Sequence, residues 1–380
     1  MAIPQAAKPN PAQVNMAARQ MLLQSGLAFT KLLPGISQGN PILGQSVRIP
    51  LDRTGIVTGV TLLVQVPMNI TAAATQSPFG PYPIVSNIQY TDFSGVVHIN
   101  CTGWQLHFLN SIKAQRAIGN SAKNAGYITG SETGVDTNLL ALPVAVANPT
   151  SAYFALYVPL AYHARGDLRG AILAQTDRGE HYLTVTFANA LVNADPFAAP
   201  FTAGTAVLAS NIVVNAFMHY LMPQGGVGPN NIPMIDLSTI YEIQGNLFDN
   251  TNIVAGQPKY SNWPNNRAIL SSTHFYDQAG AGGTLNGADI AKITMLVNGN
   301  THLRELTPQL LRLQMRDMMG YDFPSGVYYL PSRTQPVTTQ LFGNVQTQFD
   351  ITTAGAGSYF QSMYESTFLS GTPLPGVIQP

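Results

Sequence analysis

The chain has 380 residues, of which 45 % are hydrophobic, so it can bury a large core. Only 9 % of its residues are charged, whereas soluble domains average roughly 25 %, and 18 basic residues balance 18 acidic ones. Electrostatic binding of nucleic acid needs a surplus of Lys and Arg, so we expect no direct nucleic-acid contact. The single cysteine, Cys101, permits neither an internal disulfide nor a cysteine-based zinc site.

The apolar residues are not gathered into a run of about 18, so we expect no transmembrane helix. The chain also lacks the basic start and apolar stretch of a secretory signal. A surface with so few charges is poorly protected against association, which favours a chain that is covered by neighbours in an assembly. A neutral, solvated surface rich in Asn, Thr and Gln is the alternative.

Residues 1–45 form a basic N-terminal arm, because they contain Lys8, Arg19 and Lys31 but no acidic residue. Asn10-Pro11 is typical of an N-cap followed by proline in the first helical turn, and Pro34-Gly35 ends the pattern. We therefore predict an amphipathic helix that extends to Leu33. Its apolar face carries Val14, Ala18, Met21, Leu22, Phe29 and Leu32. An ordinary packing helix is the alternative to a helix with a role of its own.

From residue 46 onward the pattern is typical of β-strands, and the Gly- and Pro-rich stretch from Pro223 to Pro233 is the best domain boundary. The segment Trp104–Ile118 fits a strand or a helix. The segment Pro308–Gly320 fits a helix with Thr307 as its N-cap and an apolar stripe of Leu310, Leu311, Met315, Met318 and Met319. We expect the strands at 60–66, 86–90, 96–99, 152–162, 181–191, 212–221, 240–247, 268–276, 290–297, 326–330 and 336–352.

The two halves of the chain repeat a short pattern. Leu183–Asn189 and a strand that ends at Tyr220 are matched by Val337–Asn344 and a stretch that contains Tyr359–Tyr364. Each pair follows a predicted helical segment, Asp167–Leu173 in the first half and Pro308–Gly320 in the second. We therefore predict two similar all-β units in tandem, of the jelly-roll kind.

Motifs of enzymes are missing from the sequence. It contains no phosphate-binding loop that ends in Gly-Lys, no His-Glu-x-x-His and no Gly-x-Ser-x-Gly. The residues His98, Cys101 and His107 match no standard metal site, and the acidic residues form no evident catalytic pair. We expect no enzymatic activity, no cofactor and no metal.

Seven segments in order resemble the major capsid protein of tectiviruses, tailless icosahedral bacteriophages with a lipid membrane inside the shell. The resemblance covers residues from about 50 to 350. The segments are Gly103–Asn110, Tyr157–Tyr162, Asp167–Leu173, Phe187–Asn189, Pro233–Tyr241, Asp322–Tyr329 and Phe342–Asn344.

The resemblance implies an all-β fold of two tandem eight-stranded jelly rolls, a double jelly roll, with a few short helices and an N-terminal helix. We assign the arm to residues 1–45, the first jelly roll to 46–225, the second to 232–355, and a final strand and tail to 356–380. The resemblance further implies homotrimeric capsomers with a pseudo-hexagonal outline that tile an icosahedral shell over the membrane.

The expected partners are further copies of the chain, minor capsid or vertex proteins and the inner lipid membrane. The expected locations are the virion and, during assembly, the host cytoplasm. The resemblance places the N-terminal helix on the inner side of the shell, where Lys8, Arg19 and Lys31 would meet lipid phosphates. A secreted or surface β-sandwich binding module of the lectin or adhesin type is the alternative function.

Overall fold

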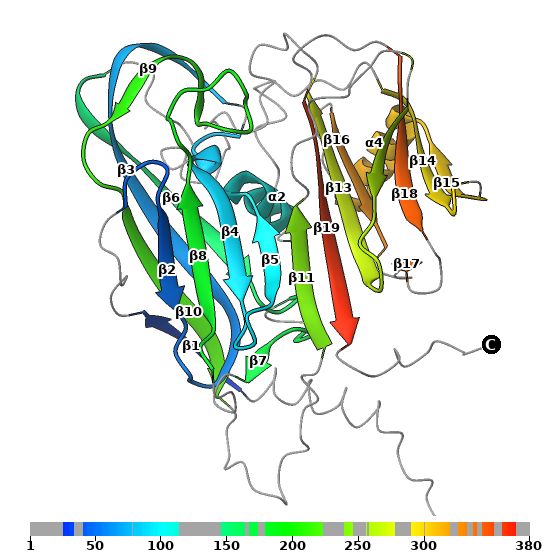
Figure 1. The fold of residues 1–380 in the computed structure, drawn as a ribbon, viewed down its shortest axis with the longest axis horizontal. Helices are drawn as coiled ribbons and strands as arrows, with labels where there is room; N and C mark the ends of the chain where they lie inside the picture. The colour runs from blue at the N-terminus through cyan, green and yellow to red at the C-terminus, as the bar shows by residue number, and fades with distance from the viewer. Residues whose placement is uncertain are drawn as a thin grey trace, which may run out of the picture.

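The computed structural model describes most of the region between residues 26 and 369, and its architecture is mostly β (Figure 1). The described ranges are 26–33, 41–77, 79–113, 146–163, 167–173, 179–222, 239–245, 256, 258–277, 290–299, 301–319, 326–332, 337–339, 344–352 and 359–369.

The first half of the chain contains ten strands, a short 3-10 helix and the helix α2. Their bounds are β1 Leu27–Leu32, β2 Ser46–Pro50, β3 Ile56–Gln76, η1 Tyr82–Ile84, β4 Val85–Thr91, β5 Val97–Cys101, α2 Gly103–Lys113, β6 Val146–Pro159, β7 Ile172–Leu173, β8 Tyr182–Phe187, β9 Phe201–Leu208 and β10 Val213–Met222. One sheet has the order β1-β10-β3-β6, with β7 and β9 also paired to β3. The facing sheet has the order β5-β4-β8-β2.

The second half contains nine strands and the helix α4 in its described part. Their bounds are β11 Thr239–Gly245, β12 Pro258–Asn262, β13 Ala268–Asp277, β14 Ile290–Val297, β15 Thr301–Leu306, α4 Pro308–Met319, β16 Val327–Pro331, β17 Val337–Thr338, β18 Val345–Ile351 and β19 Tyr359–Leu369. One sheet has the order β16-β13-β19-β11, and the facing sheet has the order β12-β18-β14-β15.

The two halves have the same topology. The strand pairs β1–β10, β3–β10, β3–β6, β2–β8, β4–β8 and β4–β5 recur as β11–β19, β13–β19, β13–β16, β12–β18, β14–β18 and β14–β15. Every one of these pairs is antiparallel. Each half is therefore an eight-stranded jelly roll, and the prediction of two tandem sandwiches is confirmed.

The same equivalence pairs α2 with α4. In the chain, α2 directly follows β5, the end strand of the sheet β5-β4-β8-β2, and α4 directly follows β15, the end strand of the sheet β12-β18-β14-β15. The segment from Asp167 to Leu173 was predicted to be the first-half helix, and this is wrong. Asp167 forms an isolated bridge with His163, and Ile172–Leu173 is the strand β7. The ambiguous segment at Trp104 is helical instead.

The predicted repeat correctly matched β10 with β19. It matched β8 with Val337–Asn344, which lies just before the true counterpart of β8. The structural counterpart of β8 is β18, which begins at Val345, directly after the matched segment. A local similarity of sequence can identify a repeat without fixing its register, because strand patterns of period two fit several positions equally well.

The N-terminal helix was predicted to extend to Leu33, but Leu27–Leu32 is the strand β1. The strand pairs with β10 over six residues, from Leu27↔Met222 to Leu32↔Phe217. Hydrogen bonds to a neighbouring strand outweigh the helical spacing of apolar residues in such a short segment. The remainder of the predicted helix, residues 10–25, lies outside the described residues.

The core continues from one half into the other. The sheets β5-β4-β8-β2 and β16-β13-β19-β11 join edge to edge through β5 and β11 into one nine-stranded sheet (Figure 1). A single cluster of buried apolar side chains includes Val60 and Trp104 from the first half and Phe275 and Phe349 from the second. The two jelly rolls are therefore packed as one body.

Candidate functional site: the seam between the two jelly rolls

The seam is built on the pairing of β5 with β11, which lie parallel, with Ile99 opposite Ile243 and Asn100 opposite Gln244. The helix α2 continues from β5 and lies between the halves (Figure 1). Most charged side chains of a protein are exposed, but two networks of charged residues are buried along this line.

The first network begins in the turn between β4 and β5. Oδ1 of Asp92 accepts hydrogen bonds from the backbone N–H groups of Ser94 and Val96, at 2.8 and 2.9 Å. Gly95 has a φ of +85°, which a residue without a side chain adopts readily. The turn therefore fixes Asp92 and leaves its Oδ2 directed at His98, with 2.8 Å to Nε2.

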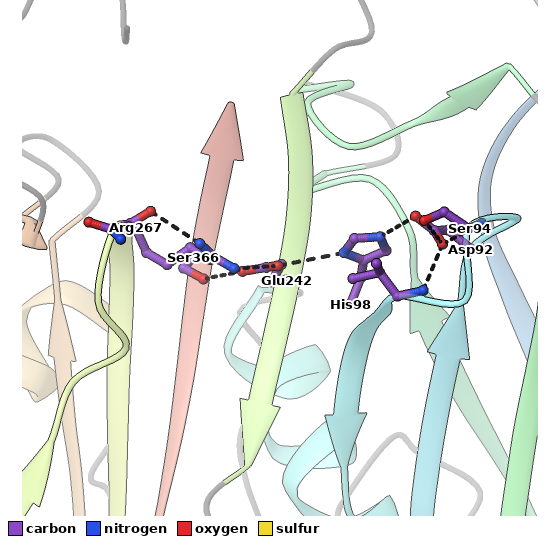
Figure 2. Close-up of polar contacts among 8 residues, drawn as sticks. Asp92, Ser94, His98, Glu242, Arg267 and Ser366 are labelled. Atoms are coloured by element: carbon purple, nitrogen blue, oxygen red, sulfur yellow. Dashed lines mark hydrogen bonds and ion pairs between the residues drawn. The ribbon is translucent and has the colours of Figure 1, made fainter. Parts of the chain in front are cut away.

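His98 lies between two carboxylates, as Figure 2 shows. Its Nδ1 is 3.5 Å from Oε1 of Glu242, which belongs to β11 in the other half. Glu242 in turn accepts from the guanidinium of Arg267, with one contact to Nε and a second at 3.2 Å to Nη2. The chain Asp92–His98–Glu242–Arg267 thus crosses from the first jelly roll to the second.

The pKa values reflect this arrangement. Burial lowers the pKa of His98, but the neighbouring carboxylates of Glu242 and Asp92 outweigh burial and raise it above its ordinary value. Burial raises the pKa of Glu242, but His98 and Arg267 outweigh it and lower that pKa. The pKa of Asp92 is lowered in the same way by His98 and by the hydrogen bonds of the turn. The structure therefore favours charged forms of all three groups.

The second network lies at the C-terminal end of α2. Nζ of Lys113, at the end of α2, forms an ion pair with Glu365 of β19 and donates to the Tyr241 hydroxyl at 2.7 Å. Tyr241 donates to Oε1 of Glu365 at 2.5 Å, and Ser271 donates to Oε2 at 2.9 Å. Burial and the charge of Glu365 raise the pKa of Tyr241 well above its ordinary value, so it stays a neutral donor.

An apolar contact lies between the two networks. Trp104 and Phe108 of α2 meet the ring of Phe275 on β13 edge to face, with centroids 4.6 and 5.0 Å apart. Gln105 donates to Gln361 at 3.2 Å and lies over Gly245, where an added Cβ would be 2.2 Å from Oε1. Glycine at 245 is what allows α2 to approach β11 this closely.

The seam therefore combines apolar packing with ion pairs that can form only in one arrangement. A buried charge without a partner costs several kcal/mol, so a displaced or rotated arrangement of the halves is disfavoured. The contacts of the seam therefore hold the two sandwiches in one fixed orientation.

The sequence analysis did not find this site. Its signal was a single acidic residue inside a strand with no other charged residue, at Glu242 in β11 and at Glu365 in β19, and a histidine after a turn aspartate. Those residues become a site only because two strands more than 140 positions apart in the chain pair side by side.

The predicted site residues lie elsewhere. Phe29, Lys31 and Leu32 are in β1, where Lys31 forms an ion pair with Asp52 that raises its pKa. Lys8, Val14, Ala18, Arg19, Met21 and Leu22 lie outside the described residues. Of the three residues that were considered as metal ligands, His98 belongs to the seam, Cys101 is buried and His107 stacks on Tyr82. Among the described residues no group of three His, Cys, Asp or Glu could hold a metal ion.

Comparison with known proteins settles the family. The family model described as "P3 major capsid protein N-terminal" matches residues 4–216, which is more than half of the chain. The model described as "P3 major capsid protein C-terminal" matches residues 238–374. The chain belongs to the P3 major capsid protein family. It is therefore a major capsid protein, a self-associating structural component of the virion and not an enzyme.

A P3 relative and several solved capsid structures agree with this assignment. The chain is 29 % identical over 349 residues to the major capsid protein P3 of Enterobacteria phage PRD1, which covers 87 % of this chain and 85 % of the relative. The fold is similar to a structure of Sulfolobus turreted icosahedral virus, with a TM-score of 0.61, 11 % identity and coverage of 90 % and 91 %. It is also similar to the major capsid protein P2 of bacteriophage PM2, with a TM-score of 0.52, 10 % identity and coverage of 90 % and 97 %. Both likenesses show the fold, the double jelly roll.

Proposed function

We propose that this P3-family protein forms homotrimeric capsomers with a pseudo-hexagonal outline, which tile an icosahedral shell over an internal lipid membrane. The observation that carries the proposal is the repetition of one sandwich topology twice in a chain. Three chains then provide six similar sandwiches, and a threefold ring acquires a nearly sixfold outline.

The composition supports obligate association. Charged residues make up 9 % of the sequence, and several large apolar side chains remain exposed in the single chain, among them Leu32, Leu63 and Leu313. Permanent interfaces are more apolar than transient ones and bury more than about 2,000 Å². A trimer with such interfaces would be the stable unit, and weaker contacts between trimers would allow errors of assembly to be corrected.

The division of the chain follows the two sandwiches. We place the first jelly roll at 46–225 and the second at 232–355. The strand β1 of the arm 1–45 adds to the first, and β19 of the segment 356–380 adds to the second.

We further propose that the N-terminal arm faces the membrane. Lys8 and Arg19 would contribute about 1 kcal/mol each near anionic lipid, whereas Lys31 already pairs with Asp52. The described residues contain no helix that is long and apolar enough to span a bilayer. The other proposed partners are minor capsid or vertex proteins, and assembly would take place in the host cytoplasm.

Light scattering on the purified chain tests the trimer. We expect a mass of three times 40.7 kDa at micromolar concentration, and negative-stain images with a hexagonal outline. A monomer that remains soluble and folded under these conditions would contradict the proposal. A shell without lipid in purified virions would contradict only its membrane part.

A further inference from the structure

We infer that the contact between α2 and the sheet β16-β13-β19-β11 holds one buried water molecule. The groups that bind this water are the indole N–H of Trp104, the side-chain amide of Gln361 and the hydroxyl of Thr273. The site lies inside a single chain, so it does not depend on the proposed trimer. It follows from the burial of these groups, from their positions near one ring and from the directions in which they can donate and accept.

The three groups are buried and lack a partner within the protein. Among the residues that the structure describes, Nε1 of Trp104, Nε2 of Gln361 and Oγ1 of Thr273 form no hydrogen bond. Each of these residues is at most 1 % exposed. Neither bulk solvent nor a neighbouring copy can therefore reach them. Buried polar groups of folded proteins nearly always have a partner, and a group left without one destabilises the fold.

All three groups lie close to Phe275 on β13. Gln361 of β19 is directly opposite Phe275 in the antiparallel pairing of β13 with β19. Thr273 precedes Phe275 by two residues on β13, so both side chains point to the same face of the sheet. Trp104 of α2 meets the ring of Phe275 edge to face, with centroids 4.6 Å apart. The helix and the sheet therefore bring the three groups together at one place in the seam.

The hydrogen bonds of Gln105 fix the orientation of the Gln361 amide. The backbone N–H of Thr102 donates to Oε1 of Gln105 at 3.0 Å, and a backbone N–H can only donate. Nε2 of Gln105 is therefore the end that donates to Oε1 of Gln361, at 3.2 Å. Exchanging O and N in either amide would place two donors face to face. Nε2 of Gln361 is thus a donor that needs an acceptor other than Gln105.

One water molecule satisfies all three groups. The indole N–H of Trp104 and Nε2 of Gln361 can only donate, so they cannot bind each other. A water accepts one hydrogen bond from each of them with its two lone pairs and donates one of its hydrogens to Oγ1 of Thr273. Three hydrogen bonds are typical of a buried water in a globular protein. The two N–H groups would repel a cation, and the three groups carry no charge that would compensate an anion, so the ligand is neutral.

The bound water is part of the contact between the two jelly rolls. It joins α2 of the first jelly roll to β13 and β19 of the second, in the region where Trp104 packs on Phe275. A water that bridges two protein groups is nearly as favourable as a direct hydrogen bond, and it requires the groups to be at a suitable separation. The water therefore adds to the contacts that fix the orientation of the two sandwiches.

Ultraviolet resonance Raman spectroscopy of the wild-type chain tests the site in solution, because indole vibrations shift when the N–H donates a hydrogen bond. The chain contains two tryptophans, and Trp263 is an internal reference, since its Nε1 donates to Oγ1 of Thr347 at 2.8 Å. We expect Trp104 to give the same hydrogen-bonded band as Trp263. A second band at the position of a free indole N–H would overturn the inference. In a crystal structure that resolves ordered waters, we expect a water within hydrogen-bond distance of all three groups, and an empty position would also overturn it.

Two isosteric substitutions test what the water contributes to stability. Thr273→Val removes the hydroxyl that the water binds, so we expect the midpoint of urea unfolding to fall below that of the wild-type chain. The matched control is Thr294→Val on β14, in the facing sheet, where the hydroxyl is also buried and has no partner among the described residues. Removing the Thr294 hydroxyl should leave the midpoint unchanged or raise it. A Thr273→Val midpoint at or above the wild-type value, or an equal fall in both variants, would contradict a water bound at Thr273.

Discussion

Two buried histidines show how local surroundings decide the charge of the same side chain. His274 lies in the second sandwich, bonded to Ser362 at 2.8 Å and packed against Phe349, and burial lowers its pKa to about 3. His98 is also buried, but it lies between Asp92 and Glu242, which raise its pKa. Burial alone favours the neutral ring, whereas two carboxylates favour the cation.

The charge of His98 makes the seam dependent on pH. Because its pKa is raised on folding, its stabilising effect is complete below the ordinary value of 6.5 and is lost as pH rises through the raised value. The lowered pKa values of Asp92 and Glu242 have the opposite consequence, since their effect is lost as pH falls below 3.8 and 4.5. The window in which all three stabilise the seam runs from about pH 4.5 to 6.5.

His98→Gln should remove this dependence. We expect the variant to lose about 1.5–3 kcal/mol of unfolding free energy near pH 5.5, as for a hydrogen bond to a charged group, and less at pH 9. Urea unfolding at both pH values measures the difference. The matched control is His163→Gln, at an exposed position, which should leave the pH profile of the wild type unchanged. A constant deficit from pH 5.5 to 9 would show that His98 is not charged in the folded protein.

At the scale of elements, α2 and α4 have the same place in the topology but different burial. Eight of the residues of α2 are buried, because the second jelly roll covers the side that the first leaves open. In the part of α4 whose burial is described, the buried apolar side chains are Pro308, Leu311 and Met315, whereas Leu310 and Met318 of the predicted apolar stripe are exposed. Only part of the predicted apolar stripe therefore lies in the core.

Leu311 and Leu313 provide a matched pair on one helix. Leu311→Asp places a carboxylate at a position that is 2 % exposed, which costs several kcal/mol, so we expect little soluble protein. Leu313→Asp should be soluble and folded, since Leu313 faces outward. The measurement is the soluble fraction of each variant after expression, compared with that of the wild-type chain. Equal yields of the two variants would mean that the buried face of α4 has been assigned incorrectly.

At the scale of the whole molecule, the arm and the first sandwich share a strand. Because β1 covers the edge of β10, a truncation that removes residues 1–35 would also expose a sheet edge. A deletion of residues 1–25 leaves β1 intact and removes Lys8 and Arg19. We expect it to form trimers with unchanged mass but fewer closed particles.

Light scattering gives the trimer mass, and counting particles in negative stain gives the yield. Replacing Lys8 and Arg19 by Gln in the full chain separates the effect of charge from that of length. Normal particle yield from the truncated chain would contradict a role of the arm in shell formation.

The sequence by itself determined the fold class, the tandem sandwiches and the helix at Pro308, because alternating apolar residues and a capped apolar stripe are local patterns. It also indicated assembly, since a large chain with few charges exposes apolar surface. Only the tertiary structure decided that Leu27–Leu32 is a strand, that α2 rather than the Asp167 segment is the counterpart of α4, and that Asp92, His98, Glu242 and Arg267 form one network. The reason is that each of these depends on which distant strands lie side by side, and the free energy of such pairing is not contained in any local stretch of sequence.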